Sequence, residues 1–180
     1  MSSSEAKEMV SAAILATIPK KKVAAYQKAL GALVIDLSLL HFLLERYFWT
    51  LTGNDEVSGG ILTRNLTFAG LLEKMEEIAK HRIRDVAQLK TLVSILRDTA
   101  KLNEERNGLV HALWVIDDNE PVFCLRRKKG KPDEVAPAPE NIDELVQKVL
   151  DVTIEFIDYK KRIPSGFDEA LKGLLGLGAK

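Results

Sequence analysis

The chain has 180 residues, enough for one compact domain with a substantial core, so residues 1–180 are expected to form a single domain. Lys and Arg total 26 and Asp and Glu total 26, which excludes a polycation that holds DNA by bulk charge. The single cysteine, Cys124, excludes an intrachain disulfide, and a reducing cytoplasm is the expected location.

The N-terminal residues predict a short helix and no secretion signal. Ser2 and Glu5 fit a capping box that opens a helix over residues 1–18, which Pro19 closes. No basic region precedes an apolar one in this segment, as a secretion signal would require.

A long helix is predicted from Lys22 to Leu51, because its apolar residues recur at steps of three and four. Its most apolar stretch, 29–49, is interrupted by four polar or charged residues: Asp36, His41, Glu45 and Arg46. A membrane span normally needs about 20 nearly uninterrupted apolar residues. We therefore expect the core helix of a soluble protein, with no membrane partner.

Two further helices are predicted in the middle of the chain. The break at 52–55 should lead into a polar loop up to Gly60, after which Thr67 caps a helix from Phe68 to about Lys80. Asp85 then opens the longest remaining periodic segment, which is expected to stay helical to about residue 112.

The pattern changes to that of a short β-hairpin after this helix. The segments 113–116 and 122–125 flank a turn-rich stretch at 117–121, and a basic tract then leads into a proline-bearing linker. The last long helix is expected to cover residues 141–161. Residues 164–180 are expected to form a poorly defined tail, within which residues 167–175 fit a short additional helix. The predicted fold is mainly α: an up-and-down bundle of four to five helices with a short hairpin before the last long helix.

The polar residues near the end of the fourth long segment are the strongest functional feature. Asn103, Asn107 and His111 are spaced by four residues, so they lie on one face of a helix, with Arg106 at its edge. These four residues are called the polar ladder below. Polar groups beside a core need hydrogen bonds, so the polar ladder requires another helix, a second subunit or a ligand.

A structural role is the competing interpretation of this pattern. A buried arginine and histidine near a helix end often pair with carboxylates, here Asp36 or Glu45 of the first long helix, or cap the last carbonyl groups. A purely structural bundle, with the polar ladder internal, therefore stays open as an alternative.

The chain resembles the HEPN superfamily at these residues. HEPN proteins are compact helical domains of toxin–antitoxin and antiviral systems, and their signature is an arginine, usually a polar residue next to it, and a histidine a few positions on. Arg106, Asn107 and His111 match this signature, and the order of helices is similar over roughly residues 28–160. One toxin branch carries a regulatory tyrosine two positions after the histidine, where this chain has Leu113.

The resemblance implies a four- or five-helix bundle, usually a homodimer, in which the arginine and histidine face a cleft between subunits. Many members are metal-independent endoribonucleases, and others have lost activity and serve as binding modules. On this basis Arg106 and His111 are the candidate catalytic residues, and Asn103 and Asn107 the supporting ones. An antitoxin protein is a further candidate partner.

Residue chemistry is consistent with such a reaction. An imidazole can exchange a proton near neutral pH, and a guanidinium can stabilise a phosphorane, so His111 and Arg106 could cleave RNA to 2′,3′-cyclic phosphate ends without a metal or other cofactor. One chain supplies one histidine at the site, and a two-fold dimer would supply the second.

Unpaired RNA is the expected substrate, because flexible nucleotides can reach in-line geometry. The basic tract Arg126, Arg127, Lys128, Lys129 and Lys131 is a candidate for binding its backbone, although a solvated loop is the simpler interpretation. Three scattered histidines do not form a zinc motif. A catalytically silent dimeric HEPN-like module that binds a protein or nucleotide is the alternative function.

Overall fold

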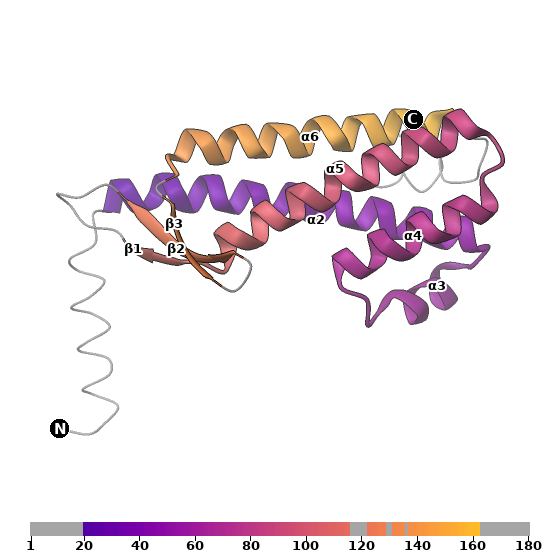
Figure 1. Ribbon diagram of the computed structural model, residues 1–180, viewed down its shortest axis with the longest axis horizontal. Coiled ribbons are helices and arrows are strands. Elements are labelled where there is room, and N and C mark those ends of the chain that lie inside the picture. The colour runs from indigo at the N-terminus through magenta and orange to yellow at the C-terminus, as the bar shows by residue number, and fades with distance from the viewer. Residues whose placement is uncertain (1–19, 116–121, 129–130, 136, 163–180) are drawn as a thin grey trace, which may run out of the picture.

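The computed structural model describes residues 20–115, 122–128, 131–135 and 137–162, and these form five helices and a three-stranded antiparallel sheet (Figure 1). The predicted fold class is confirmed: a mainly helical bundle with a β-hairpin before its last helix. The short helix expected over 1–18 and the tail at 164–180 lie outside the described residues.

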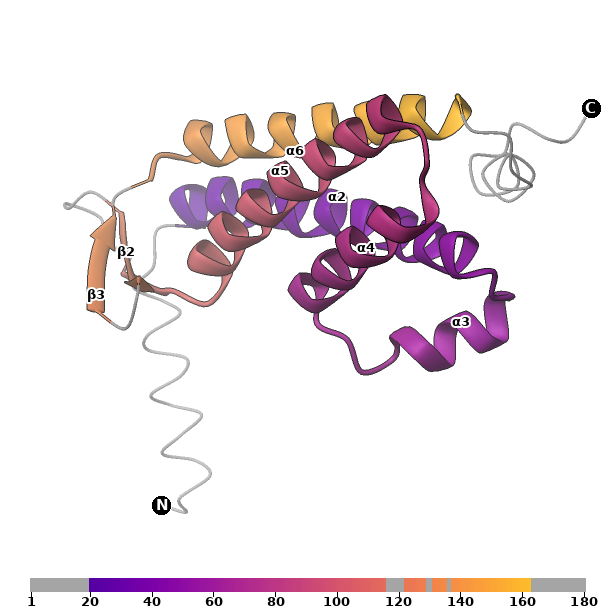
Figure 2. The ribbon, with the colours of Figure 1, turned by 45° about the vertical axis from the view of Figure 1, so that its right-hand side comes forward.

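Three long helices build the body of the bundle: α2 (Lys20–Thr52), α5 (Val86–Val110) and α6 (Pro139–Lys161). They lie side by side in both ribbon views, with α4 (Phe68–Arg82) packed against α2 and α5 at one end (Figures 1 and 2). The side chains that α2 turns to the core step by three and four residues, as its sequence predicts. The largest fully buried members of this series are Leu33, Leu40, Leu44 and Tyr47.

Aromatic rings join α2 to α6 in the core. The hydroxyl groups of Tyr47 and Tyr159 lie 3.2 Å apart, and the Tyr47 ring meets Phe156 edge-on with centroids separated by 5.7 Å. Both tyrosine hydroxyls are buried, and their mutual hydrogen bond satisfies them. Burial raises the pKa of Tyr159 far above its usual value, so this residue stays neutral.

The helix starts and stops follow the caps that the sequence provides. Thr67 Oγ1 accepts a hydrogen bond from the Gly70 backbone N–H at 3.1 Å. α4 begins at Phe68, directly after Thr67, as predicted. Asp85 caps α5 in the same way. Gly53 has φ +74° and ends α2, since a left-handed residue there stops the helix.

The prediction of a polar loop up to Gly60 was wrong, because α3 (Glu56–Thr63) occupies this segment. Asp55 Oδ1 accepts backbone N–H groups of Val57 and Ser58 at 2.8 and 2.9 Å and so starts a helix where the composition suggested a turn. Two adjacent glycines weaken the helical pattern of this segment in the sequence.

The predicted hairpin is present, and a third strand extends it. β1 (Leu113–Val115) pairs with β2 (Phe123–Lys128), and β2 pairs with β3 (Lys131–Val135), each time antiparallel. The basic tract was expected to be a loop, but most of it lies in β2 and at the start of β3. That prediction was wrong because ladder hydrogen bonds along β2 hold this polar segment in an extended conformation.

One helix among the described residues, Val23–Thr52, is long and apolar enough to span a membrane on length and composition alone. The core helix of a soluble protein meets the same criterion. Here one face of the helix packs against α4, α5 and α6 inside the bundle.

Candidate functional site at the C-terminal end of α5

The polar ladder lies where α5 ends beside the sheet, at the opposite end of the bundle from α3 (Figures 1 and 2). The helix ends there because a side chain of β1 caps it: Trp114 Nε1 donates a hydrogen bond to the Leu109 carbonyl at 2.9 Å. This cap joins the last turn of α5 to the first strand, so the two elements hold the residues between them in place.

The polar ladder runs from the core to the surface. Asn103 is buried with an exposed fraction of 8%, Arg106 and Asn107 are half-buried, and His111 is exposed. Arg106 Nη1 donates a hydrogen bond to Asn107 Oδ1 at 2.8 Å. The amide therefore orients the guanidinium, which leans toward its neighbour.

His111 is the C-cap of α5 rather than a residue inside it, because the helix ends at Val110 and not near residue 112. Its φ of −97° and ψ of 7° depart from helical values, yet its backbone N–H still bonds the Asn107 carbonyl at 3.1 Å. The Cα atom of His111 therefore still lies about one helical turn beyond that of Asn107. The imidazole is held at the surface by a backbone that is fixed on both sides.

No carboxylate neutralises Arg106 within the described part of the chain. The ion pairs that the structure forms there involve other residues, so the expected alternative pairing with Asp36 or Glu45 is not found. Its Nε is buried without a hydrogen-bond partner among these residues. A guanidinium without a carboxylate partner among the described residues suits an anionic ligand, which would bind its terminal nitrogens because Nε is buried.

Trp114 packs within the molecule. Its indole is half-buried and lies 5.4 Å, centroid to centroid, from the ring of Tyr26, whose hydroxyl donates to the Pro137 carbonyl at 3.1 Å. These contacts tie α2, β1 and the start of α6 together. The tryptophan therefore supports the site and is not free to stack on a base.

The basic tract adjoins the same end of the bundle. Arg126, Arg127 and Lys128 belong to β2, where their Cα partners in β3 are Asp133, Pro132 and Lys131. Lys129 lies outside the described residues. The strand places the backbone of these residues on the sheet that also carries β1, two residues beyond His111.

The other two histidines lie away from the polar ladder. His41 of α2 is half-buried and stacks on Phe68 with centroids 4.2 Å apart, and burial lowers its pKa. His81 is exposed in the last turn of α4. No group of three or more metal-ligating side chains occurs in the described part of the molecule.

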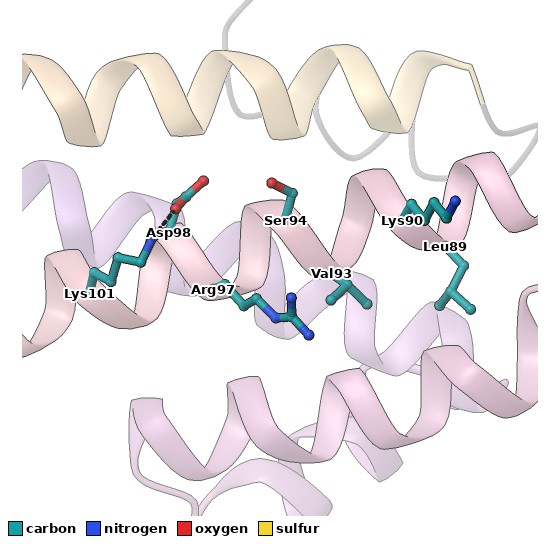
Figure 3. Close-up of a pocket in the computed structure, with 7 residues that line it drawn as sticks. All are labelled: Leu89, Lys90, Val93, Ser94, Arg97, Asp98 and Lys101. Atoms are coloured by element: carbon teal, nitrogen blue, oxygen red, sulfur yellow. Dashed lines mark hydrogen bonds and ion pairs between the residues drawn. The ribbon is translucent and has the colours of Figure 1, made fainter.

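A shallow hollow of about 390 Å³ lies along the N-terminal half of α5 and was not anticipated from the sequence (Figure 3). Its three cations project from one helix, but two of them already face carboxylates: Lys101 pairs with Asp98 at 2.8 Å, and Arg97 lies 3.9 Å from Glu76. We assign it no ligand. Its lining residues are Leu89, Lys90, Val93, Ser94, Arg97, Asp98 and Lys101.

Comparisons of the chain with protein-family models, with curated proteins and with solved structures find no match. The case for a function therefore depends on the residues and their geometry.

Proposed function

We propose that this protein is a metal-independent endoribonuclease that cleaves single-stranded RNA and acts in the cytoplasm as a homodimer. The observation that carries the proposal is the state of Arg106: it is oriented by Asn107, has no carboxylate partner among the described residues, and lies five residues, about 1.4 helical turns, before the exposed His111. This is the composition needed to bind a phosphate beside a proton-transfer group.

In the proposed reaction the RNA 2′-oxygen attacks the adjacent phosphorus and the 5′-oxygen leaves. A base removes the 2′-hydroxyl proton, an acid protonates the departing 5′-oxygen, and the products are a 2′,3′-cyclic phosphate and a 5′-hydroxyl end. Arg106 would stabilise the charge that accumulates on the phosphorane oxygens, with Asn107 fixing its orientation. Asn103 would support the inner end of the polar ladder.

His111 would carry out the proton transfers. Its exposed imidazole at the end of α5 can reach a bound nucleotide. Because His41 and His81 lie elsewhere, the second proton-transfer group would be His111 of a second copy. A two-fold axis beside the polar ladder would bring two such residues into one cleft.

The experiment is digestion of unstructured RNA in excess EDTA, with analysis of the product ends. We expect cyclic-phosphate products from the wild-type protein and a loss of at least about 100-fold for His111→Ala and for Arg106→Ala. His81→Ala and Arg97→Ala are matched controls, since both residues are exposed and lie outside the polar ladder. Thermal unfolding of all four variants should stay close to wild type.

A catalytically silent module that binds a protein, such as an antitoxin, or a nucleotide is the second candidate. It is favoured by the partial burial of Arg106 and by the absence of a direct hydrogen bond between Arg106 and His111 in the described structure. Wild-type protein that leaves diverse RNAs intact, yet binds an oligonucleotide or nucleotide through Arg106, would establish this alternative. Unfolding of either alanine variant would instead indicate a structural polar ladder.

A further inference from the structure

The solvent-facing side of α2 is apolar along its middle. Ile35, Leu39 and Phe42 step by four and three residues and so share one face, opposite the core series of α2. Ile35 is 68% exposed. Between Lys28 and Arg46 the exposed residues of this helix are Ile35, Ser38, Leu39 and Phe42, and none of them is charged.

α3 continues this apolar surface at the C-terminal end of α2. Its buried residues face Trp49, and three apolar side chains on its other sides have exposed fractions of 55–74%. Arg46 connects the two helices: its guanidinium lies 5.9 Å from the Phe42 ring centroid and pairs with Glu56 of α3 at 2.9 Å. We call this set the α2–α3 surface; its members are Ile35, Leu39, Phe42, Val57, Ile61 and Leu62.

The outer faces of the other long helices differ sharply from this. The exposed side chains of α6 are mostly charged, and those of α5 include both signs of charge, as expected for faces in contact with water. Of the ten large apolar side chains that are exposed in the described part of the chain, six therefore belong to the α2–α3 surface. The exposed charged residues on α5 and α6 include Lys90, Arg97, Lys101, Glu104, Glu105, Asp143, Glu144, Lys148, Asp151, Glu155 and Asp158.

We propose that the α2–α3 surface is the interface with a second copy of this chain. For the two His111 side chains also to share one site, as the proposed function requires, the two-fold axis must run along the bundle from this surface toward the polar ladder. Six side chains exposed to this extent present on the order of 600 Å² of apolar surface, which is at the upper limit for a monomer and near the ~800 Å² that each partner contributes to a standard interface. A two-fold interface pairs a surface with itself. The six apolar side chains satisfy this condition, because pairing them with their copies brings no like charges together.

Two polar side chains at this surface, Ser38 and Arg46, already have partners. Ser38 Oγ donates to the Val34 carbonyl at 2.6 Å, and the Arg46 charge is balanced by Glu56. Burial by a second copy would leave neither group unsatisfied. The Arg46–Glu56 pair leaves no net positive charge where α2 meets α3, which disfavours an anionic membrane as the occupant.

The test is sedimentation equilibrium of the full chain over a wide concentration range. Wild-type protein is expected to be a dimer, and the double variant Ile35→Glu with Ile61→Glu is expected to dissociate at least about 100-fold more readily. The matched control is Val86→Glu with Ile154→Glu, which introduces the same charge at two equally exposed apolar positions on α5 and α6 and should stay dimeric. All four positions are exposed, so folding should be unaffected, and circular dichroism checks this.

Thiol labelling distinguishes the other occupants. In the dimer a cysteine at Leu39→Cys should react slowly with a maleimide and one at Ile154→Cys rapidly, while the native Cys124 is buried. Three results would overturn the proposal: a dimer that survives the double glutamate change, a monomer in which Leu39→Cys is still protected by a terminal segment, or a monomer that binds phosphatidylcholine vesicles through this surface. None of these readouts depends on RNA cleavage. A dimer that survives the double glutamate change would overturn this interface alone, whereas a monomer would also remove the second His111 on which the proposed function rests.

Discussion

At the scale of single residues, His41 should make the stability of the fold depend on pH. Burial against Phe68 lowers its pKa in the folded protein below the unfolded value of 6.5, with a smaller opposing effect from Glu45. The unfolded chain then binds more protons between these two pKa values. The contribution of neutral His41 to the free energy of unfolding is therefore fully present above about pH 6.5. It decreases as the pH falls below about 6.5, and it decreases no further once the pH is below the folded pKa.

The measurement is urea unfolding at several values between about pH 7.5 and pH 5. His41→Phe keeps a ring against Phe68 but cannot be protonated, so the decrease in stability over this range should become smaller. His81→Gln removes an exposed histidine and is the control. An unchanged pH dependence in His41→Phe would show that this residue is not the source.

Trp114 offers a second test at this scale, because one hydrogen bond to the Leu109 carbonyl caps α5. Trp114→Phe retains an aromatic ring near Tyr26 and removes the donor, so the unfolding free energy should fall by about 1 kcal/mol. Denaturant titration measures this. Tyr26→Phe, which removes the hydrogen bond to the Pro137 carbonyl, makes a useful comparison because it leaves the α5 cap in place. No loss of stability in Trp114→Phe would show that water replaces the cap.

At the scale of elements, docking of α3 should depend on one glycine. A Cβ added to Gly59 would overlap the Trp49 ring, whereas one added to Gly60 would meet nothing within 4 Å. We expect Gly59→Ala to lower the unfolding free energy by about 1–3 kcal/mol through overpacking. Gly60→Ala should raise it by about 0.5–1 kcal/mol, since alanine is the better helix former.

Tryptophan fluorescence during unfolding can follow both variants, because Trp49 Nε1 also donates a hydrogen bond to Thr63 Oγ1 of α3 at 3.2 Å. Gly59→Ala should alter the native emission and Gly60→Ala should not. Equal stability of the two variants would contradict the close contact between α3 and the indole.

The elements that could be predicted are those with a strong apolar period and a side-chain cap. Thr67 and Asp85 located the starts of α4 and α5, because a capping side chain before a periodic segment is a local signal. α3 was missed because Gly59 and Gly60 lower the helix propensity of this segment. The helix is stabilised by packing on Trp49, a residue of α2, and the sequence pattern does not show this contact. β3 was missed because Pro132 in a polar segment resembles a linker.

The candidate site could be predicted only in part. The spacing of Asn103, Asn107 and His111 gave their common face, and the length of the arginine side chain allowed its contact with Asn107. The end of α5 at Val110 could not be read from the apolar pattern, since it depends on a hydrogen bond from Trp114 in the next element. The lack of a carboxylate beside Arg106 in the described structure is likewise a tertiary property.

At the scale of the whole molecule, two surfaces of different character lie toward opposite ends of the bundle. The polar ladder is next to the sheet, where the basic tract also begins, and α3 carries part of the α2–α3 surface to the other end (Figure 2). Charged residues cover the outer faces of α5 and α6, which lie between these two surfaces. The α2–α3 surface and Arg106 therefore lie on separate parts of the described structure, although Leu113 and Leu125 of the sheet are also exposed beside the polar ladder.

Subunit mixing tests whether two copies share one ribonuclease site. If both His111 side chains of a dimer are needed, only dimers of two wild-type chains cleave RNA, so an equal mixture with His111→Ala should retain about a quarter of the wild-type activity instead of about a half. Activity is measured after subunit exchange at constant total protein. A linear decrease with the wild-type fraction would show that one chain is sufficient. Combining His111→Ala with Ile35→Glu and Ile61→Glu gives the control: if the α2–α3 surface holds the active dimer together, this variant cannot enter it, and the decrease becomes linear.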